Sequence, residues 1–226
     1  MSQVNTMIVK GAMTAPLAVE TLEISQMYMH MKLKVTIDQS AWLMVIVTSP
    51  DHVIRAQALV MNGEKELILS DDPQTSSFST IPGCIPSGEW SIQLMNGSAE
   101  KELSYTIEAE CGNEILPGLY TNPIQSFATS KQKADFTLDE WDPSNVLNNE
   151  ERWYRGDFHT HTYLSDGKLS PEEGLASAKK MGLDFFVATD HNIIPTKWIN
   201  DGILIIPGIE VTSSKGHFNA LGSRAG

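Results

Sequence analysis

Residues 156–167 read GDFHTHTYLSDG and carry two of the six histidines of the chain. His159 and His161 stand two residues apart, so on a β-strand their side chains point to the same face. Three further segments lie at or just past apolar runs: Asp190-His191-Asn192, Gly208-Ile209-Glu210 and Gly216-His217. Neutral imidazole and carboxylate are the usual ligands of Zn, Mn or Fe. The pattern predicts a metal site assembled at the ends of strands.

The sequence around these segments predicts strands and one helix. Apolar runs expected as strands are residues 153–163, 184–189, 203–211 and 217–221. Ser170 and Glu173 can form a capping box with Pro171 at the first helical position, and Gly182 marks the helix end. Strand, helix and strand within about 35 residues predict a parallel βαβ unit. Because functional groups gather at the carboxyl ends of parallel strands, the candidate ligands are expected at one edge.

The segment Ser213-Ser214-Lys215-Gly216 is typical of a tight turn. In such a hairpin Thr212 pairs with His217, and Glu210 then shares a face with His217, about 7–8 Å away on the diagonal. Each motif alone has an ordinary explanation. His-x-His occurs on exposed strands, Asp166-Gly167 is a common turn, and Glu210 could be a buried acid with a basic partner. The joint placement of these residues is what favours a metal site.

Upstream, residues 20–110 predict short strands separated by turns. Met27 to Ile37 alternates apolar and polar side chains with period two, which puts His30 on the polar, outward side. Residues 42–47 form a continuous apolar run, as in a central strand. Strands at this spacing predict a β-sandwich. We therefore expect three regions: a β-sandwich domain over residues 1–120, a linker over residues 121–152 and an α/β part over residues 153–226.

Composition narrows the class of protein. The chain has 226 residues and a formal net charge of −12, which makes it a poor generic partner for nucleic acid or an anionic membrane. No apolar run reaches the roughly 20 residues of a membrane-spanning helix, and the first residues lack the pattern of a signal peptide. Cys84 and Cys111 are expected to be free thiols. These features predict a cytoplasmic protein without a membrane partner.

Taken together, the motifs resemble those of a known family. The matching segments are Asp157-Phe158-His159-Thr160-His161-Thr162, Ser165-Asp166-Gly167, Thr189-Asp190-His191-Asn192, Gly208-Ile209-Glu210 and Gly216-His217. They resemble the PHP superfamily of metallohydrolases, named for its polymerase and histidinol phosphatase members. Residues 81–90 are similar to the β-domain of its carbaryl hydrolase-like branch. The resemblance implies an all-β N-terminal sandwich followed by the α/β first part of a (β/α)7 barrel, incomplete because the chain stops after the fourth barrel strand.

The resemblance also implies two or three divalent metal ions, usually Zn, Mn or Fe, held by His159, His161, Asp166, His191, Glu210 and His217. His159 and His161 would share one ion with Glu210. Glu210 would bridge to a second ion bound also by His217, and Asp166 and His191 would help to hold a third. Asp157 and Asp190 would support these ligands, with direct metal binding by Asp190 as an alternative.

The function implied is metal-dependent hydrolysis, in which metal-bound hydroxide attacks a phosphoester or a carboxylic or carbamic ester or amide. A small-molecule ester or phosphoester is the expected substrate, and single-stranded nucleic acid is not favoured because the chain is acidic. An alternative is a non-catalytic β-sandwich binding module attached to an incomplete metal site, since the downstream ligands of the family are absent. A third hypothesis is a homo-oligomer in which two copies cover each other's open sheet edges.

Overall fold

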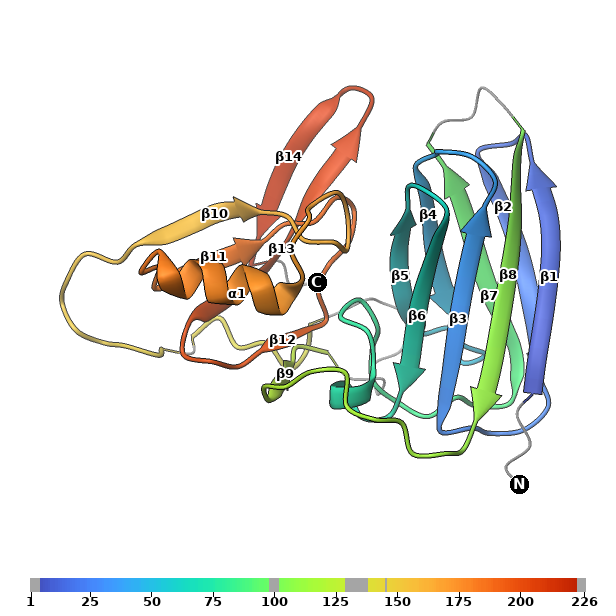
Figure 1. The fold of residues 1–226 in the computed structure, drawn as a ribbon, viewed down its shortest axis with the longest axis horizontal. Coiled ribbons are helices and arrows are strands. Elements are labelled where there is room, and N and C mark those ends of the chain that lie inside the picture. The colour runs from blue at the N-terminus through green and yellow to red at the C-terminus, as the bar shows by residue number, and fades with distance from the viewer. Residues whose placement is uncertain (1–4, 98–101, 129–137, 145, 223–226) are drawn as a thin grey trace.

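The computed structural model describes residues 5–97, 102–128, 138–144 and 146–222. Strands dominate, and the described residues contain a single α-helix. Figure 1 shows two parts side by side, a pair of stacked sheets at the N-terminal end and a smaller sheet with the helix at the C-terminal end.

The N-terminal part is a sandwich of two four-stranded antiparallel sheets. One sheet has the order β1-β8-β3-β6 and the other has the order β2-β7-β4-β5. The strands are β1 (Asn5–Met13), β2 (Leu17–Ile24), β3 (His30–Ile37), β4 (Leu43–Thr48), β5 (Ile54–Val60), β6 (Glu64–Ser70), β7 (Gly88–Asn96) and β8 (Leu103–Gly112). Alternate residues of each strand face the partner sheet, so Leu33 of β3, Val45 of β4 and Trp90 of β7 are completely buried between the sheets.

The C-terminal part is built on a second kind of sheet, with the order β10-β11-β13-β14. Strands β10 and β11 are parallel to each other, β11 is parallel to β13, and β14 returns antiparallel to β13. A separate two-stranded ribbon pairs β12 with β9. The elements are β9 (Ile124–Ser126), β10 (Gly156–Thr160), α1 (Pro171–Lys180), β11 (Phe185–Ala188), β12 (Lys197–Ile199), β13 (Leu204–Ser213) and β14 (Gly216–Leu221).

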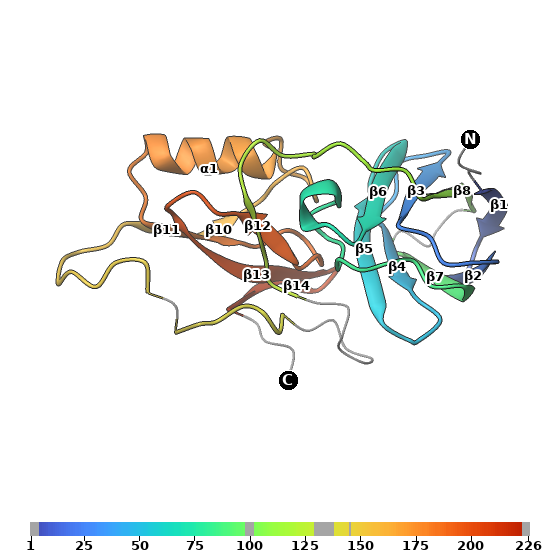
Figure 2. The same ribbon diagram turned by 90° about the horizontal axis from the view of Figure 1, so that it is seen from below.

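Helix α1 begins and ends where its sequence predicts. Ser170 and Glu173 form the reciprocal capping box, and Pro171 occupies the first turn. Gly182 has φ +67°, the left-handed conformation that commonly follows the last turn of a helix. Leu175 is buried beneath the helix, and Figure 2 shows α1 on one side of the β10-β11-β13-β14 sheet. The predicted βαβ unit is therefore present as β10, α1 and β11.

The predicted fold class is wrong in its second part: the sandwich is present, but the α/β part of a (β/α)7 barrel that should follow it is not. The described part of the chain is mostly strand, divided among several sheets, with one α-helix instead of a helix after each strand. Between β11 and β13 the chain forms β12, which pairs with β9. The turn between β13 and β14 leaves only Ser214 and Lys215 outside the strands, whereas a parallel connection needs a dozen or more residues. Strand β14 must therefore return antiparallel.

A second apolar core joins the two parts. Phe78 and Ile81, which follow the short 3-10 helix η1 (Pro73–Thr75) of the sandwich, belong to the same buried cluster as Phe186 and Trp198. The backbone N–H of Thr196 donates to the carbonyl of Phe78 at 3.0 Å. The C-terminal part therefore packs against this segment of the sandwich. The domain boundaries predicted from the sequence stay a prediction.

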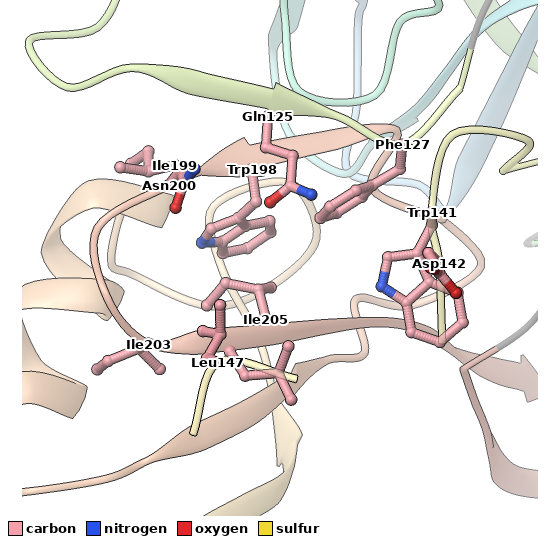
Figure 3. Close-up of a pocket in the computed structure, with 11 residues that line it drawn as sticks. Gln125, Phe127, Trp141, Asp142, Leu147, Trp198, Ile199, Asn200, Ile203 and Ile205 are labelled. Carbon is pink, nitrogen blue, oxygen red and sulfur yellow. The ribbon is translucent and has the colours of Figure 1, made fainter. Parts of the chain in front are cut away.

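One cavity lies inside the C-terminal part. It has a volume of about 20 Å³, and Figure 3 shows Trp198 of β12 between Gln125 of β9 and Ile205 of β13. That volume is enough for one water molecule and too small for a substrate. No helix in the described ranges is both long enough and apolar enough to cross a membrane.

Candidate metal centre

All six predicted ligands lie together at the carboxyl edge of the parallel strands. Their nitrogen and oxygen atoms form three overlapping groups, each with its atoms within 4.8 Å of one another. The groups are His159 with His161 and Glu210, His161 with Asp166 and His191, and His191 with Glu210 and His217. Parallel β10, β11 and β13 bring the segments to one edge, as the βαβ pattern predicts. That these residues bind metal stays a prediction.

His159 and His161 sit at the end of β10 on one face. Their rings stack with centroids 4.8 Å apart, and their Nε2 atoms are 2.9 Å apart. At least one of two imidazole nitrogens this close must carry a proton, unless both point to a shared cation. The pair is therefore suited to a shared cation.

Glu210 lies at the centre of the cluster. Its side chain is 8% exposed, and its Oε2 atom is buried without a hydrogen-bond partner. That oxygen is 3.0 Å from Nε2 of His161, 3.0 Å from Nδ1 of His191 and 3.6 Å from Nε2 of His159. Leaving a buried carboxylate oxygen without a partner is costly. A divalent cation between this oxygen and the imidazoles would remove that cost, so the residues fit the implied metal.

Asp166, in the loop between β10 and α1, completes the cluster. Its Oδ1 atom is 2.8 Å from Nδ1 of His161, and its Oδ2 atom is 3.4 Å from Nε2 of His191. Burial acts to raise the pKa of this carboxyl, but the hydrogen bond with His161 and the nearby charge of His191 outweigh it and lower the pKa. Asp166 is thus held as a carboxylate, the form that binds metal.

The hairpin register predicted from the turn is confirmed. Thr212 pairs with His217 and Glu210 pairs with Asn219, so Glu210 and His217 share a face. The Nδ1 atom of His217 is 3.0 Å from Oε1 of Glu210. Glu210 therefore presents its two carboxylate oxygens to different histidines, which is the geometry of a bridging ligand.

The two supporting aspartates are placed differently. Asp190 is completely buried and accepts hydrogen bonds from the backbone N–H and the hydroxyl of Thr162, each at 2.8 Å, and from the hydroxyl of Ser165 at 2.6 Å. Burial raises its pKa and these bonds oppose the rise. Asp190 therefore fixes the loop that carries Asp166. Asp157 instead accepts from the backbone N–H of His159 at 3.1 Å and stabilises β10 locally.

Three residues that orient the ligands were missed by the sequence analysis. The hydroxyl of Thr212 is 2.6 Å from Nδ1 of His191. Asn192 has φ +53°, and its side chain bonds both the N–H and the carbonyl of Thr212, which fixes His191 against β13. Asn219 contacts Nδ1 of His159. Thr212 stands two residues from Glu210, and Asn219 stands two residues from His217, so each shares a strand face with a predicted ligand. That spacing was the only feature of the sequence that could have identified them.

The sandwich also reaches the cluster. Nζ of Lys65, on β6, donates to the carbonyl of Tyr163 at 2.7 Å, inside the loop between His161 and Asp166. Burial lowers the pKa of Lys65, and the charge of Asp190 opposes that shift. The indole of Trp42 meets the ring of His191 edge-on, with centroids 5.3 Å apart. The sandwich thus contributes two side chains at the rim of the site, Lys65 of β6 and Trp42, which directly precedes β4.

No protein-family model matches the chain, and no curated protein matches it. A relationship to the PHP superfamily therefore stays a prediction that rests on the quoted motifs.

Proposed function

We propose that this chain is a metal-dependent hydrolase with chemistry like that of the PHP superfamily. One observation carries the proposal, namely the buried Oε2 atom of Glu210, which accepts no hydrogen bond although imidazole nitrogens of three histidines lie within 3.6 Å of it. A structural carboxylate would be expected to have hydrogen-bond donors of its own, as Asp190 has. Two or three Zn, Mn or Fe ions bound there would act as Lewis acids and activate water for attack.

The chain's own residues divide the remaining work. His191 and Glu210 are 7% and 8% exposed and form the floor of the site. His159 and His217 are each 46% exposed and face the solvent side, where a substrate arrives. Thr212 and Asn192 hold the floor in place, which keeps the ligand set rigid while the substrate changes.

The substrate proposed is a small phosphoester, or a carboxylic or carbamic ester or amide, since one metal-assisted attack serves phosphorus and carbon alike. Single-stranded nucleic acid is disfavoured by the net charge of −12. The proposal includes a cytoplasmic location, which suits the free thiols of Cys84 and Cys111.

The test is hydrolysis by the purified chain after chelation and reloading with Zn, Mn or Fe. The substrates are 4-nitrophenyl phosphate, bis(4-nitrophenyl) phosphate and 4-nitrophenyl acetate. We expect turnover that disappears on chelation and returns on reloading, and that is lost in Glu210→Gln but kept in Glu23→Gln, an exposed carboxylate of the sandwich. Turnover that survives chelation or the Glu210 substitution would contradict the proposal. Metal binding without turnover on any substrate would favour the binding module instead.

A further inference from the structure

The face of β4 that points away from the sandwich core is apolar. Leu43, Val45 and Val47 are completely buried in the core, so the residues that alternate with them point outward. Within β4 those residues are Met44, Ile46 and Thr48, and the apolar Trp42 directly precedes the strand. In an antiparallel sheet with one solvated face, that face is normally polar. The continuous apolar run of residues 42–47 therefore needs a second explanation besides core packing.

This apolar face forms one wall of a cleft of about 980 Å³. The cleft lies between the β2-β7-β4-β5 sheet and the β13–β14 hairpin, whose tip stands beside the β4–β5 side of the sandwich in Figures 1 and 2. We call it the sheet–hairpin cleft. The sandwich wall includes Leu17, Trp42, Met44, Ile46, Leu59 and Met95, and the hairpin wall includes Ile209 and Val211. Its volume is at the upper end of the range typical of small-molecule sites.

The sheet–hairpin cleft opens directly onto the candidate metal centre. His217, Thr212 and Asn192 line the cleft and also belong to the metal centre or hold it in place. Trp42 touches the ring of His191 from the cleft side. A molecule whose scissile group reaches His217 therefore has its body between the two walls.

The lining of the cleft also disfavours a ligand with charged substituents, because it offers them no charged partner. Among the described residues around the sheet–hairpin cleft, none is Asp, Glu, Lys or Arg. The whole chain carries 28 acidic and 16 basic residues. A lining of this size without any of them therefore differs in composition from the rest of the protein surface. The polar groups present, such as Gln57 and Asn192, are neutral.

We propose that the sheet–hairpin cleft binds the apolar part of the substrate, a long alkyl or aryl group attached next to the scissile bond. This inference rests on the proposed hydrolase function and narrows its substrate class to esters or phosphoesters with a bulky apolar substituent. The sandwich then determines the substrate specificity of the enzyme, because Trp42, Met44 and Ile46 contact the apolar substituent.

Two phosphonates that resist hydrolysis test the inference, since they share a head group and differ only in the tail. Isothermal titration compares methylphosphonate with octylphosphonate on the zinc-loaded chain. Each buried methylene is worth about a fourfold gain in affinity, so we expect octylphosphonate to bind at least tenfold more tightly. The double variant Met44→Thr/Ile46→Thr should lose about tenfold in octylphosphonate affinity and leave methylphosphonate unchanged. The matched control Ile8→Thr/Val19→Thr changes two exposed apolar residues outside the cleft and should bind like the parent.

A readout without metal separates the two proposals. On the chelator-treated chain, 2-naphthol should bind the parent and the control but not Met44→Thr/Ile46→Thr, with circular dichroism showing that each variant is folded. Equal affinity of the two phosphonates for the parent overturns the apolar cleft while leaving the hydrolase proposal intact. If turnover survives chelation or Glu210→Gln but 2-naphthol still binds in a Met44- and Ile46-dependent way, the hydrolase proposal fails and the apolar site remains. If a second copy of the chain fills the cleft, sedimentation shows a dimer and 2-naphthol does not bind the parent, which overturns the inference.

Discussion

Gly167 packs against the backbone that carries two residues of the site, and its replacement by alanine should damage both stability and metal binding. A Cβ at this position would lie 2.5 Å from the carbonyl carbon and oxygen of His161 and 2.7 Å from the nitrogen of Thr162. The shorter distance falls about 0.9 Å below the 3.4 Å of ordinary contact. The atoms that would have to move are backbone, so no side chain can rotate away. Gly167 is not among the described glycines with positive φ, so the expected effect is steric.

Overpacking of this kind costs about 1–3 kcal/mol. For a chain of this length that corresponds to a fall of roughly 2–12 °C in Tm. Relief of the clash moves either His161 or the loop of Asp166, which face each other at 2.8 Å, so zinc affinity should fall by about tenfold or more. Thermal unfolding followed by circular dichroism gives the first quantity, and zinc titration against a chromophoric chelator gives the second.

Gly174→Ala is the matched control because it is the same chemical change in open space. Nothing lies within 4 Å of a Cβ at Gly174, which is inside α1. Replacing a helical glycine there should stabilise the chain by about 0.4–1 kcal/mol and raise Tm by roughly 1–4 °C. If Gly167→Ala unfolds at the parent temperature and binds zinc with parent affinity, the packing of the Asp166 loop on His161 is not as described.

Three further substitutions test other parts of the account. Asp190→Asn should cost about 1–3 kcal/mol in urea unfolding, because an amide nitrogen cannot accept the bonds from Thr162 and Ser165; parent-like stability would show that this network contributes little. Thr212→Val removes the hydroxyl beside His191 at nearly constant volume and should lower zinc affinity by about 10- to 100-fold, whereas unchanged affinity would show that the hydroxyl does not orient the ring. Lys197 is completely buried, and burial lowers its pKa well below 10.5 in the folded chain, so the unfolded chain binds more protons and folding weakens as pH falls from 10.5 toward the folded pKa. Urea unfolding at pH 10 and pH 8 should therefore show Lys197→Met gaining stability relative to the parent at the lower pH, and a difference independent of pH would contradict this reading.

Local features of the C-terminal part were predictable because short-range chemistry determines them. The capping box of Ser170 and Glu173 sets the start of α1, and the short turn after Ser213 fixes the pairing of Thr212 with His217. The six candidate ligands come together because they stand at the ends of neighbouring strands. These inferences need only a few residues of context.

The barrel prediction failed because a family resemblance was extended over segments whose own pattern does not support it. The stretch after β11 contains Pro195 and lacks helical periodicity, and Trp198 and Ile199 pair with β9 from far upstream. Such a pairing depends on the path of the preceding segment, which local sequence does not encode.

Burial of polar residues by distant segments was also beyond the sequence. His30 was expected at the surface, yet it is 3% exposed because Glu114 beyond β8 folds over it, with Nε2 of His30 3.3 Å from the carboxylate. The amine of Lys197 is buried against the hydroxyl of Ser76 from the sandwich. Both contacts join residues far apart in the sequence, so periodicity within one strand cannot reveal them.

The most direct test of the metal centre is the number of metal ions per chain, measured by mass spectrometry after equilibrium dialysis against Zn, Mn or Fe. Glu210 belongs to two of the three ligand groups, and only the group of His161, Asp166 and His191 does without it. We predict two or three ions per parent chain, at most one in Glu210→Gln, and the parent number in Glu23→Gln. A parent chain without bound metal, or a Glu210→Gln variant with the full number of ions, would contradict it.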